Sequence, residues 1–90
     1  MRHMPVEMQV RDVLSSVLQL GTRASALTRA SALLGGLPEL DSMAVVTLIT
    51  SLEESFGIEI QDDEISADTF ATLGSLVDYV EHKLKATSAA

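Results

Sequence analysis

The sequence predicts a small all-α domain, and three observations support this fold class. Apolar residues recur at three- and four-residue steps in separate stretches of the chain, which is the spacing of amphipathic helices. Patterns typical of strands are nearly absent. The length of 90 residues is that of one domain, and 47% hydrophobic residues suffice for one core. We therefore expect a single helical bundle.

The first predicted helix spans residues 6–20, followed by a long loop over residues 21–41. Pro5 stands at the start of the helix, where its missing amide hydrogen costs nothing, and Gly21 is expected to end it. Within the loop we expect a helical turn near residues 24–30. Four leucines are expected to anchor the loop on the bundle: Leu33, Leu34, Leu37 and Leu40.

The clearest helix runs from Ser42 to Phe56. Asp41 is a good N-cap, because its carboxylate accepts from free backbone amides and faces the positive end of the helix dipole. Gly57 follows the last turn, where a left-handed residue commonly ends a helix. The inward stripe is formed by Val45, Leu48, Ile49, Leu52 and Phe56.

The remaining chain predicts a short extended link at residues 58–60, a turn or short helix up to Phe70, and a last helix capped by Thr72. The fold is thus a four-helix bundle with three long helices, one short helix and a long loop between the first two. We interpret residues 1–3 as a vector-derived remnant, residues 4–85 as the folded domain and residues 86–90 as a frayed tail.

Charge and composition exclude several classes of function. The net charge is −7, and no Lys or Arg occurs between Arg29 and Lys83. This acidity disfavours binding to nucleic acid or anionic membranes. No apolar run is long enough to span a bilayer, and no secretory signal is visible. Cysteine is absent, which is compatible with the cytoplasm.

Catalytic and metal-binding patterns are missing from the sequence. His82 stands alone on the last predicted helix. The acidic residues 62–64 lack the alternating ligands and glycine turn of a calcium loop. The pair Gly35 and Gly36 has no preceding strand and no following lysine, unlike a phosphate-binding loop. We therefore expect neither an enzyme nor a metal site.

Several phrases together resemble the acyl carrier protein family, most specifically from Leu33 to Leu84. Asp41, Ser42 and a large apolar Met43 open the second helix, and Phe56 follows fourteen residues after the serine. The match continues in three later segments: Leu-Glu-Glu-Ser-Phe-Gly-Ile-Glu-Ile, Asp-Asp-Glu-Ile and Thr-Leu-Gly-Ser-Leu-Val-Asp-Tyr-Val. The spacing of these phrases, rather than any one of them, makes the resemblance specific.

The resemblance implies a four-helix acyl-carrier bundle that carries 4′-phosphopantetheine covalently on Ser42, with acyl groups bound as thioesters. It implies that Asp41 acts as helix cap and as a charge contact. Contacts with partner enzymes are expected from Met43, Glu53, Glu54, Glu59, Asp62 and Asp63. The partners would be a phosphopantetheinyl transferase and acyl-loading ligases, acyltransferases or synthases with basic patches. A monomer is the expected state.

The sequence also departs from the commonest members of this family. Carriers of fatty acid synthesis usually have acidic residues where this chain has Ala44 and Thr47, which favours a dedicated pathway of bacterial lipid or polyketide biosynthesis. Residues 33–50 resemble carriers from exosortase and exopolysaccharide systems. Carriers of nonribosomal peptide synthesis have Gly-Gly-x-Ser, and Gly36 lies too far from Ser42 for that, so an aminoacyl cargo is the second choice.

Two alternatives of other classes remain open at the level of sequence. One is an interaction module that kept the fold without the arm, and the other is a small enzyme. A further hypothesis is that an acyl chain folds back between the helices. The residues that would line such a cavity serve equally as ordinary core: Leu48, Leu52, Ile60, Leu76 and Val80.

Overall fold

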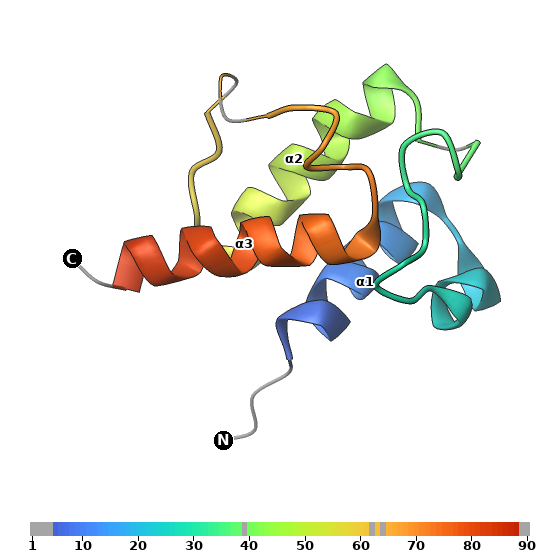
Figure 1. Ribbon diagram of the computed structural model, residues 1–90, viewed down its shortest axis with the longest axis horizontal. Helices are drawn as coiled ribbons and strands as arrows, with labels where there is room; N and C mark the ends of the chain where they lie inside the picture. The colour runs from blue at the N-terminus through green and yellow to red at the C-terminus, as the bar shows by residue number, and fades with distance from the viewer. Residues whose placement is uncertain (1–4, 39, 62, 64, 89–90) are drawn as a thin grey trace.

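A computed structural model describes residues 5–38, 40–61, 63 and 65–88 of the chain. Within these residues the elements are three α-helices and one short 3-10 helix, with no named strand (Figure 1): α1 (Val6–Leu18), η1 (Gly21–Ala26), α2 (Ser42–Phe56) and α3 (Leu73–Ser88). The predicted all-helical class is confirmed, as is the long connection between the first two long helices.

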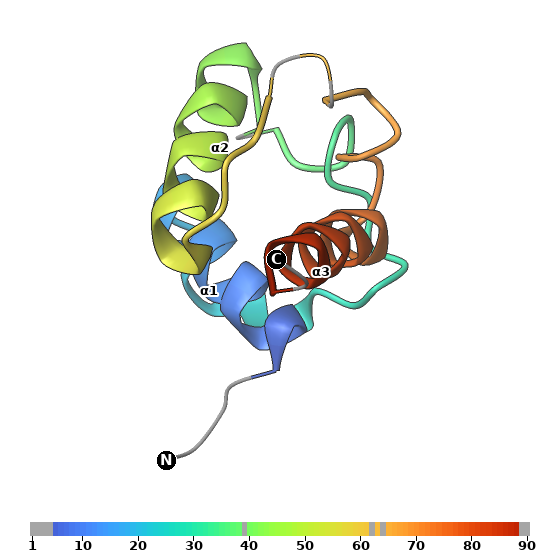
Figure 2. The ribbon, with the colours of Figure 1, turned by 90° about the vertical axis from the view of Figure 1, so that its left-hand side faces the viewer.

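The first helix is the centre of the packing. It contacts both α2 and α3, and α2 stands across the direction of α3 (Figure 2). The buried side chains form one cluster, to which every helix and both long connections contribute. Its fully buried members are Val10, Leu14, Leu33, Leu48, Leu52, Leu73, Leu76, Val77 and Val80. All the residues that we considered as cavity lining are buried in this cluster.

The first helix ends earlier than its sequence predicts. It stops at Leu18, and Gln19 takes the left-handed conformation with φ 54° that was expected at Gly21. The amide of Leu20 donates to the Ser15 carbonyl at 3.1 Å, and this turn directs the Leu20 side chain into the core, where 4% of it is exposed. Burial of Leu20 therefore ends the helix. The 3-10 helix η1 begins at Gly21, whose φ is 60°. It therefore lies slightly earlier than the helical turn predicted near residues 24–30.

The long loop is tied to the start of α3 by backbone hydrogen bonds. Ala32 and Thr72 form an isolated antiparallel bridge. The amides of Leu73 and Gly74 donate to the carbonyls of Ser31 and Arg29, at 3.0 and 2.9 Å. These two amides lie in the first turn of α3, where a helix offers them no acceptor of its own. The loop therefore caps α3 from outside.

An ion pair closes the same contact. Nη2 of Arg29 lies 2.7 Å from Oδ1 of Asp78, which is on the second turn of α3. The hydrogen bond that Arg29 donates to Asp78 is the main cause that raises the pKa of Arg29 above its ordinary value. Both side chains are about half exposed or more, so the pair serves to orient the loop rather than to stabilise it strongly.

Three of the four predicted loop anchors are at least partly buried. Leu33 and Leu40 belong to the core and Leu37 packs against it. The prediction for Leu34 is wrong, since 42% of its side chain is exposed. Leu34 begins a turn over residues 34–36, in which the Leu33 carbonyl accepts hydrogen bonds from the amides of Gly36 and Leu37, at 3.1 and 2.9 Å. The turn leaves Leu34 exposed while Leu33 faces the core.

The connection from α2 to α3 is extended at first and then turns. Ile58 and Ile60 are buried and Glu59 between them is exposed, as expected for an extended link. The described residues 66–71 form turns rather than a regular short helix, while Asp62 and Glu64 lie outside the described residues.

The predicted cap of α3 is confirmed. The Ser75 amide donates to Oγ1 of Thr72 at 3.1 Å, and the Thr72 amide donates to Oγ of Ser75 at 3.0 Å. The helix continues through Ser88, past the expected start of the tail. None of the described helices is both long and apolar enough to cross a membrane.

Candidate functional site

The start of α2 is built by Asp41. Its backbone is extended, with φ −99° and ψ −176°, and its Oδ1 accepts a hydrogen bond from the Ala44 amide at 2.8 Å. Its carbonyl accepts from the Val45 amide at 2.9 Å and so begins the helical ladder. The predicted N-cap is confirmed. The cap fixes the direction in which the first turn of α2 leaves the loop.

Ser42 is the first residue of α2, and its side chain is exposed. Asp41 accepts from the amides of Ala44 and Val45, and among the described residues the amides of Ser42 and Met43 have no acceptor. The helix dipole is positive at this end. A phosphate ester on the Ser42 oxygen would therefore meet free amides and a favourable potential. The residues present thus fit a phosphate-linked group on this hydroxyl.

The Ser42 hydroxyl has no hydrogen-bond partner among the residues that the structure describes. A serine becomes a strong nucleophile when a base accepts its proton. No base among the described residues contacts the Ser42 hydroxyl.

An apolar patch adjoins Ser42 on the outer face of α2. Met43 is 75% exposed and Val46 is 62% exposed. The nearby hydroxyls of Thr47 and Thr50 donate to the helix's own carbonyls of Met43 and Val46, both at 3.2 Å. Met43 was predicted to contact partners, and its exposure fits that interpretation. Val46 was missed, although its position one turn after Met43 was the signal that could have identified it.

Glu53 has a structural partner that the sequence did not indicate. Its Oε2 accepts a hydrogen bond from the Ile60 amide at 2.8 Å, and the side chain is partly buried. Gly57, with φ 65°, ends the helix and turns the chain back, so that Ile60 can reach Glu53. The Glu53 carboxylate therefore holds the α2–α3 connection in place.

The other predicted acidic residues belong to the end of α2 and to the connection that follows it. Glu54, Glu59 and Asp63 are exposed, and Asp62 lies outside the described residues. Glu54 is twelve residues after Ser42, which places it about 18 Å along the helix. The structure therefore brings Asp41, Ser42 and Met43 together at one end of α2 and places Glu54 toward the other end.

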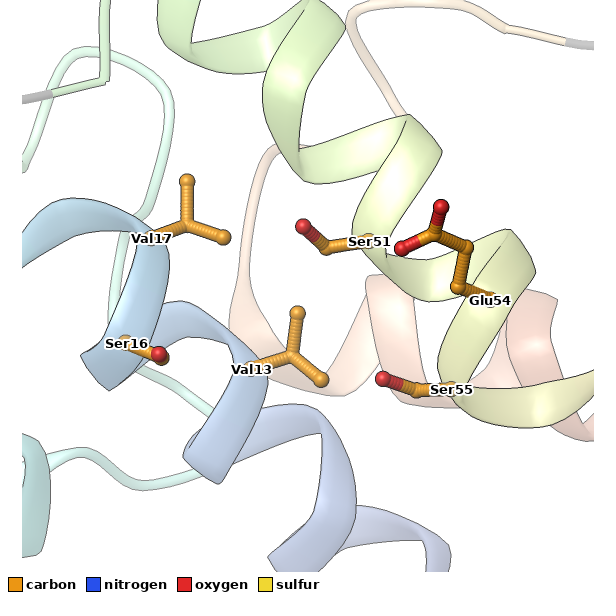
Figure 3. A pocket seen from close by; sticks show the side chains of 6 residues that line it. All are labelled: Val13, Ser16, Val17, Ser51, Glu54 and Ser55. Atoms are coloured by element: carbon orange, nitrogen blue, oxygen red, sulfur yellow. The ribbon is translucent and has the colours of Figure 1, made fainter.

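The surface of the described chain includes two shallow hollows. One of about 250 Å³ is lined by Val6, Glu81, Leu84 and Lys85. The other, of about 170 Å³, lies between α1 and α2 (Figure 3) and is lined by Val13, Ser16, Val17, Ser51, Glu54 and Ser55. Neither hollow has the size and enclosure expected of an enzyme's substrate pocket.

Comparison with protein families gives a match over most of the chain. Residues 8–80 match the model described as the phosphopantetheine attachment site. The matched range includes Asp41, Ser42 and the whole of α2.

Solved structures of carrier proteins resemble the chain closely. A holo acyl carrier protein from Nitrosomonas europaea, solved by NMR, is 58% identical and superposes with a TM-score of 0.83, with 92% of this chain and 99% of that chain covered. A second match is a chain in the crystal structure of an engineered glycine:[carrier protein] ligase from Bradyrhizobium japonicum, complexed with a carrier protein from Agrobacterium tumefaciens and ATP. It is 27% identical, with a TM-score of 0.73 and coverage of 86% of this chain and 97% of that chain.

Proposed function

The chain belongs to the phosphopantetheine-attachment family and is an acyl carrier protein rather than an enzyme, and on that premise we propose that its arm is attached to Ser42. The observation that carries this proposal is the position of Ser42, exposed at the capped N-terminus of α2. A hydroxyl there is open to a second protein and lies beside amides that suit a phosphate.

The covalent 4′-phosphopantetheine supplies a flexible terminal thiol that carries acyl groups as thioesters. In the loading reaction, the Ser42 oxygen bonds to the β-phosphorus of coenzyme A and adenosine 3′,5′-bisphosphate leaves. The hydroxyl proton passes to a base of the transferase, since Ser42 has no described base of its own. Asp41 holds the first turn of α2 in place by accepting the hydrogen bond of the Ala44 amide. The chain contains no cysteine that could compete for the acyl group.

We propose that the partners are a phosphopantetheinyl transferase and acyl-loading ligases, acyltransferases or synthases with basic patches. The carrier protein complexed with a ligase among the similar structures supports partners of this kind. Met43 and Val46 would contact them first, because both lie exposed beside Ser42. Glu54, Glu59, Asp62 and Asp63 would raise the rate of association with a basic surface. Glu53 would contribute charge while it holds Ile60.

The proposal also covers the bounds of the domain, the oligomeric state, the location and the pathway of the protein. The carrier domain is taken as residues 4–85, with residues 1–3 and 86–90 outside it. A monomer suits a carrier that docks with several enzymes in turn, and the absence of cysteine suits the cytoplasm. The first turn of α2 carries no acidic residue. This contrasts with the carriers of fatty acid synthesis and supports a dedicated pathway with few partner enzymes.

Loading of substituted chains tests the proposal. The purified chain, coenzyme A, magnesium and a broad-specificity transferase are incubated and the intact mass is measured. Ser42→Ala should abolish the gain of one arm while its circular dichroism remains that of the wild type. Ser25→Ala is the matched control, because Ser25 is also exposed but lies in η1; it should load fully. Equal loading of Ser42→Ala and the wild type would overturn the assignment.

A further inference from the structure

The long loop after α1 contains an exact tandem repeat. Residues 22–27 and residues 28–33 both have the sequence Thr-Arg-Ala-Ser-Ala-Leu. Most of the first copy lies in η1, and its Leu27 is buried. The second copy runs along the start of α3, and its Leu33 is buried as well. One hexapeptide therefore has two structures, and contacts outside it have to decide which copy takes which place.

The contacts with α3 do not distinguish the two copies. In the second copy, Arg29 pairs with Asp78 and Leu33 is fully buried. The other bonds that tie this copy to α3 come from its main chain. The first copy has the same groups six residues earlier, with Arg23 and Leu27 in the equivalent places. A shift of six residues would therefore present the first copy to α3 with the same set of groups.

The residues that follow each copy are different. The second copy is followed by the turn that contains Gly35 and Gly36. The equivalent places after the first copy hold Arg29 and Ala30. Gly35 has φ 85°, a conformation that a residue with a side chain adopts only under strain. A shift of six residues would force Arg29 into this conformation.

Gly36 adds a steric restriction to the same turn. A Cβ at this position would lie 2.5 Å from the carbonyl oxygen of Ala32 and 2.6 Å from its Cβ. After the shift, Ala30 would occupy this position, and its Cβ would meet Ala26 in the place of Ala32. A backbone carbonyl cannot move aside as the end of a flexible side chain does. The turn therefore accepts only the register in which two glycines follow the repeat.

We propose that Gly35 and Gly36 select the register of the tandem repeat, so that the second copy is bound to α3 and the first is not. The selection fixes the length of the chain between this contact and the cap of α2, which is residues 34–41. The shifted register would lengthen that segment by one whole copy. It would also unwind η1 and move Ala24 from the core to the exposed place of Ala30.

A disulfide can report which register is present. Ala32 and Thr72 form an antiparallel bridge, and its two hydrogen bonds come from the residues on either side of them. The two Cα atoms of such a pair lie about 4.5 Å apart, which is within the range of a disulfide. In the shifted register, Ala26 would stand opposite Thr72 instead.

Two double variants therefore trap the two registers. Ala32→Cys with Thr72→Cys reports the observed register, and Ala26→Cys with Thr72→Cys reports the shifted one. Both share the change at Thr72, so its effect on the cap of α3 is the same in each. The natural chain has no cysteine that could interfere, and the intact mass verifies that no arm thiol is present. Glutathione buffers and peptide masses give the equilibrium constant of each disulfide.

The first outcome concerns Gly36→Ala, introduced into both double variants. In the parent chain the 32–72 disulfide should be far more stable than the 26–72 disulfide. Gly36→Ala should raise the equilibrium constant of the 26–72 disulfide by about tenfold. Gly57→Ala is the matched control, because Gly57 also has a positive φ of 65° but has open space around it; it should not raise this constant. An equal effect of the two substitutions would overturn the proposal.

A second variant adds no volume and keeps the test decisive if Gly36→Ala does not fold. Arg29→Gly with Ala30→Gly places two glycines after the first copy and leaves Gly36 unchanged. It should strengthen the 26–72 disulfide and weaken the 32–72 disulfide. Arg29→Gln, which removes only the ion pair with Asp78, is its control. A 26–72 disulfide that stays at the level of the Arg29→Gln control would contradict the selection of register by glycine.

Discussion

Oε2 of Glu53 lies 2.8 Å from the backbone nitrogen of Ile60 and accepts its hydrogen bond. The two residues belong to different segments, the last turn of α2 and the connection that follows it. The bond fixes the return of the chain over the core, because Ile60 is buried and its amide would otherwise lack a partner. An acidic residue that the sequence assigned to partner contact thus has a part in the fold.

This bond predicts different effects of two substitutions at Glu53. Glu53→Ala leaves the Ile60 amide unpaired and should lower the free energy of unfolding by about 1–3 kcal/mol. Glu53→Gln keeps an acceptor oxygen and should recover most of that loss. Urea unfolding followed by circular dichroism measures both. If the two variants were equally stable, the hydrogen bond would have no role in the fold.

Two substitutions at Asp41 should separate its effect on stability, as a helix cap, from the effect of its charge on loading. Asp41→Ala removes the acceptor of the Ala44 amide and should cost about 1 kcal/mol of stability. Asp41→Asn keeps the acceptor and should unfold close to the wild type. A loading rate that falls in Asp41→Asn would then report the charge contact alone. Equal stability of Asp41→Ala and the wild type would contradict the capping role.

The apolar patch beside Ser42 predicts a functional effect without a structural one. Met43 is 75% exposed, so Met43→Ala should change stability by less than about 0.5 kcal/mol. It should nevertheless lower kcat/KM for loading several-fold, because the transferase has to cover Met43 to reach Ser42. Met8→Ala, at an exposed methionine of α1, is the matched control and should load like the wild type. Equal rates in the two variants would argue against the patch.

The contact between the long loop and α3 predicts that Gly74 does not tolerate a side chain. A Cβ there would lie 2.9 Å from the carbonyl oxygen of Arg29. Gly74→Ala should therefore destabilise the fold by about 1–3 kcal/mol despite the better helix propensity of alanine. Asp78→Asn removes the ion pair with Arg29 but adds no volume, and its urea midpoint should stay near that of the wild type. A Gly74→Ala variant that is more stable than Asp78→Asn would contradict this account.

The parts of the fold that depend on local signals could be predicted from the sequence. The bounds and the cap of α2 follow from Asp41, Gly57 and the apolar stripe between them, and all three lie within one short segment. Thr72 and Ser75 mark the start of α3 in the same local way. The end of α1 was misplaced because burial of Leu20, a tertiary effect, outweighed the turn preference of Gly21.

The candidate site was predictable in part for the same reason. The position of Ser42 at the start of a capped helix follows from adjacent residues, and the family resemblance is what proposes it, among the serines, as the attachment residue. Two features join segments that are distant in the sequence: the contact of Arg29 with Asp78 and the hollow between α1 and α2. The bond from Ile60 to Glu53 spans only seven residues but depends on how the chain turns back after α2. No periodicity or motif indicates such contacts.

Peptide mass spectrometry of the loaded wild-type chain tests the central claim most directly. After incubation with coenzyme A, magnesium and a transferase, the account predicts one phosphopantetheine per chain, on the fragment that contains Ser42. Fragmentation should place it on the Ser42 oxygen and not on Ser51 or Ser55. An arm on any other residue, or no arm while a known carrier in the same tube is fully loaded, would contradict the claim.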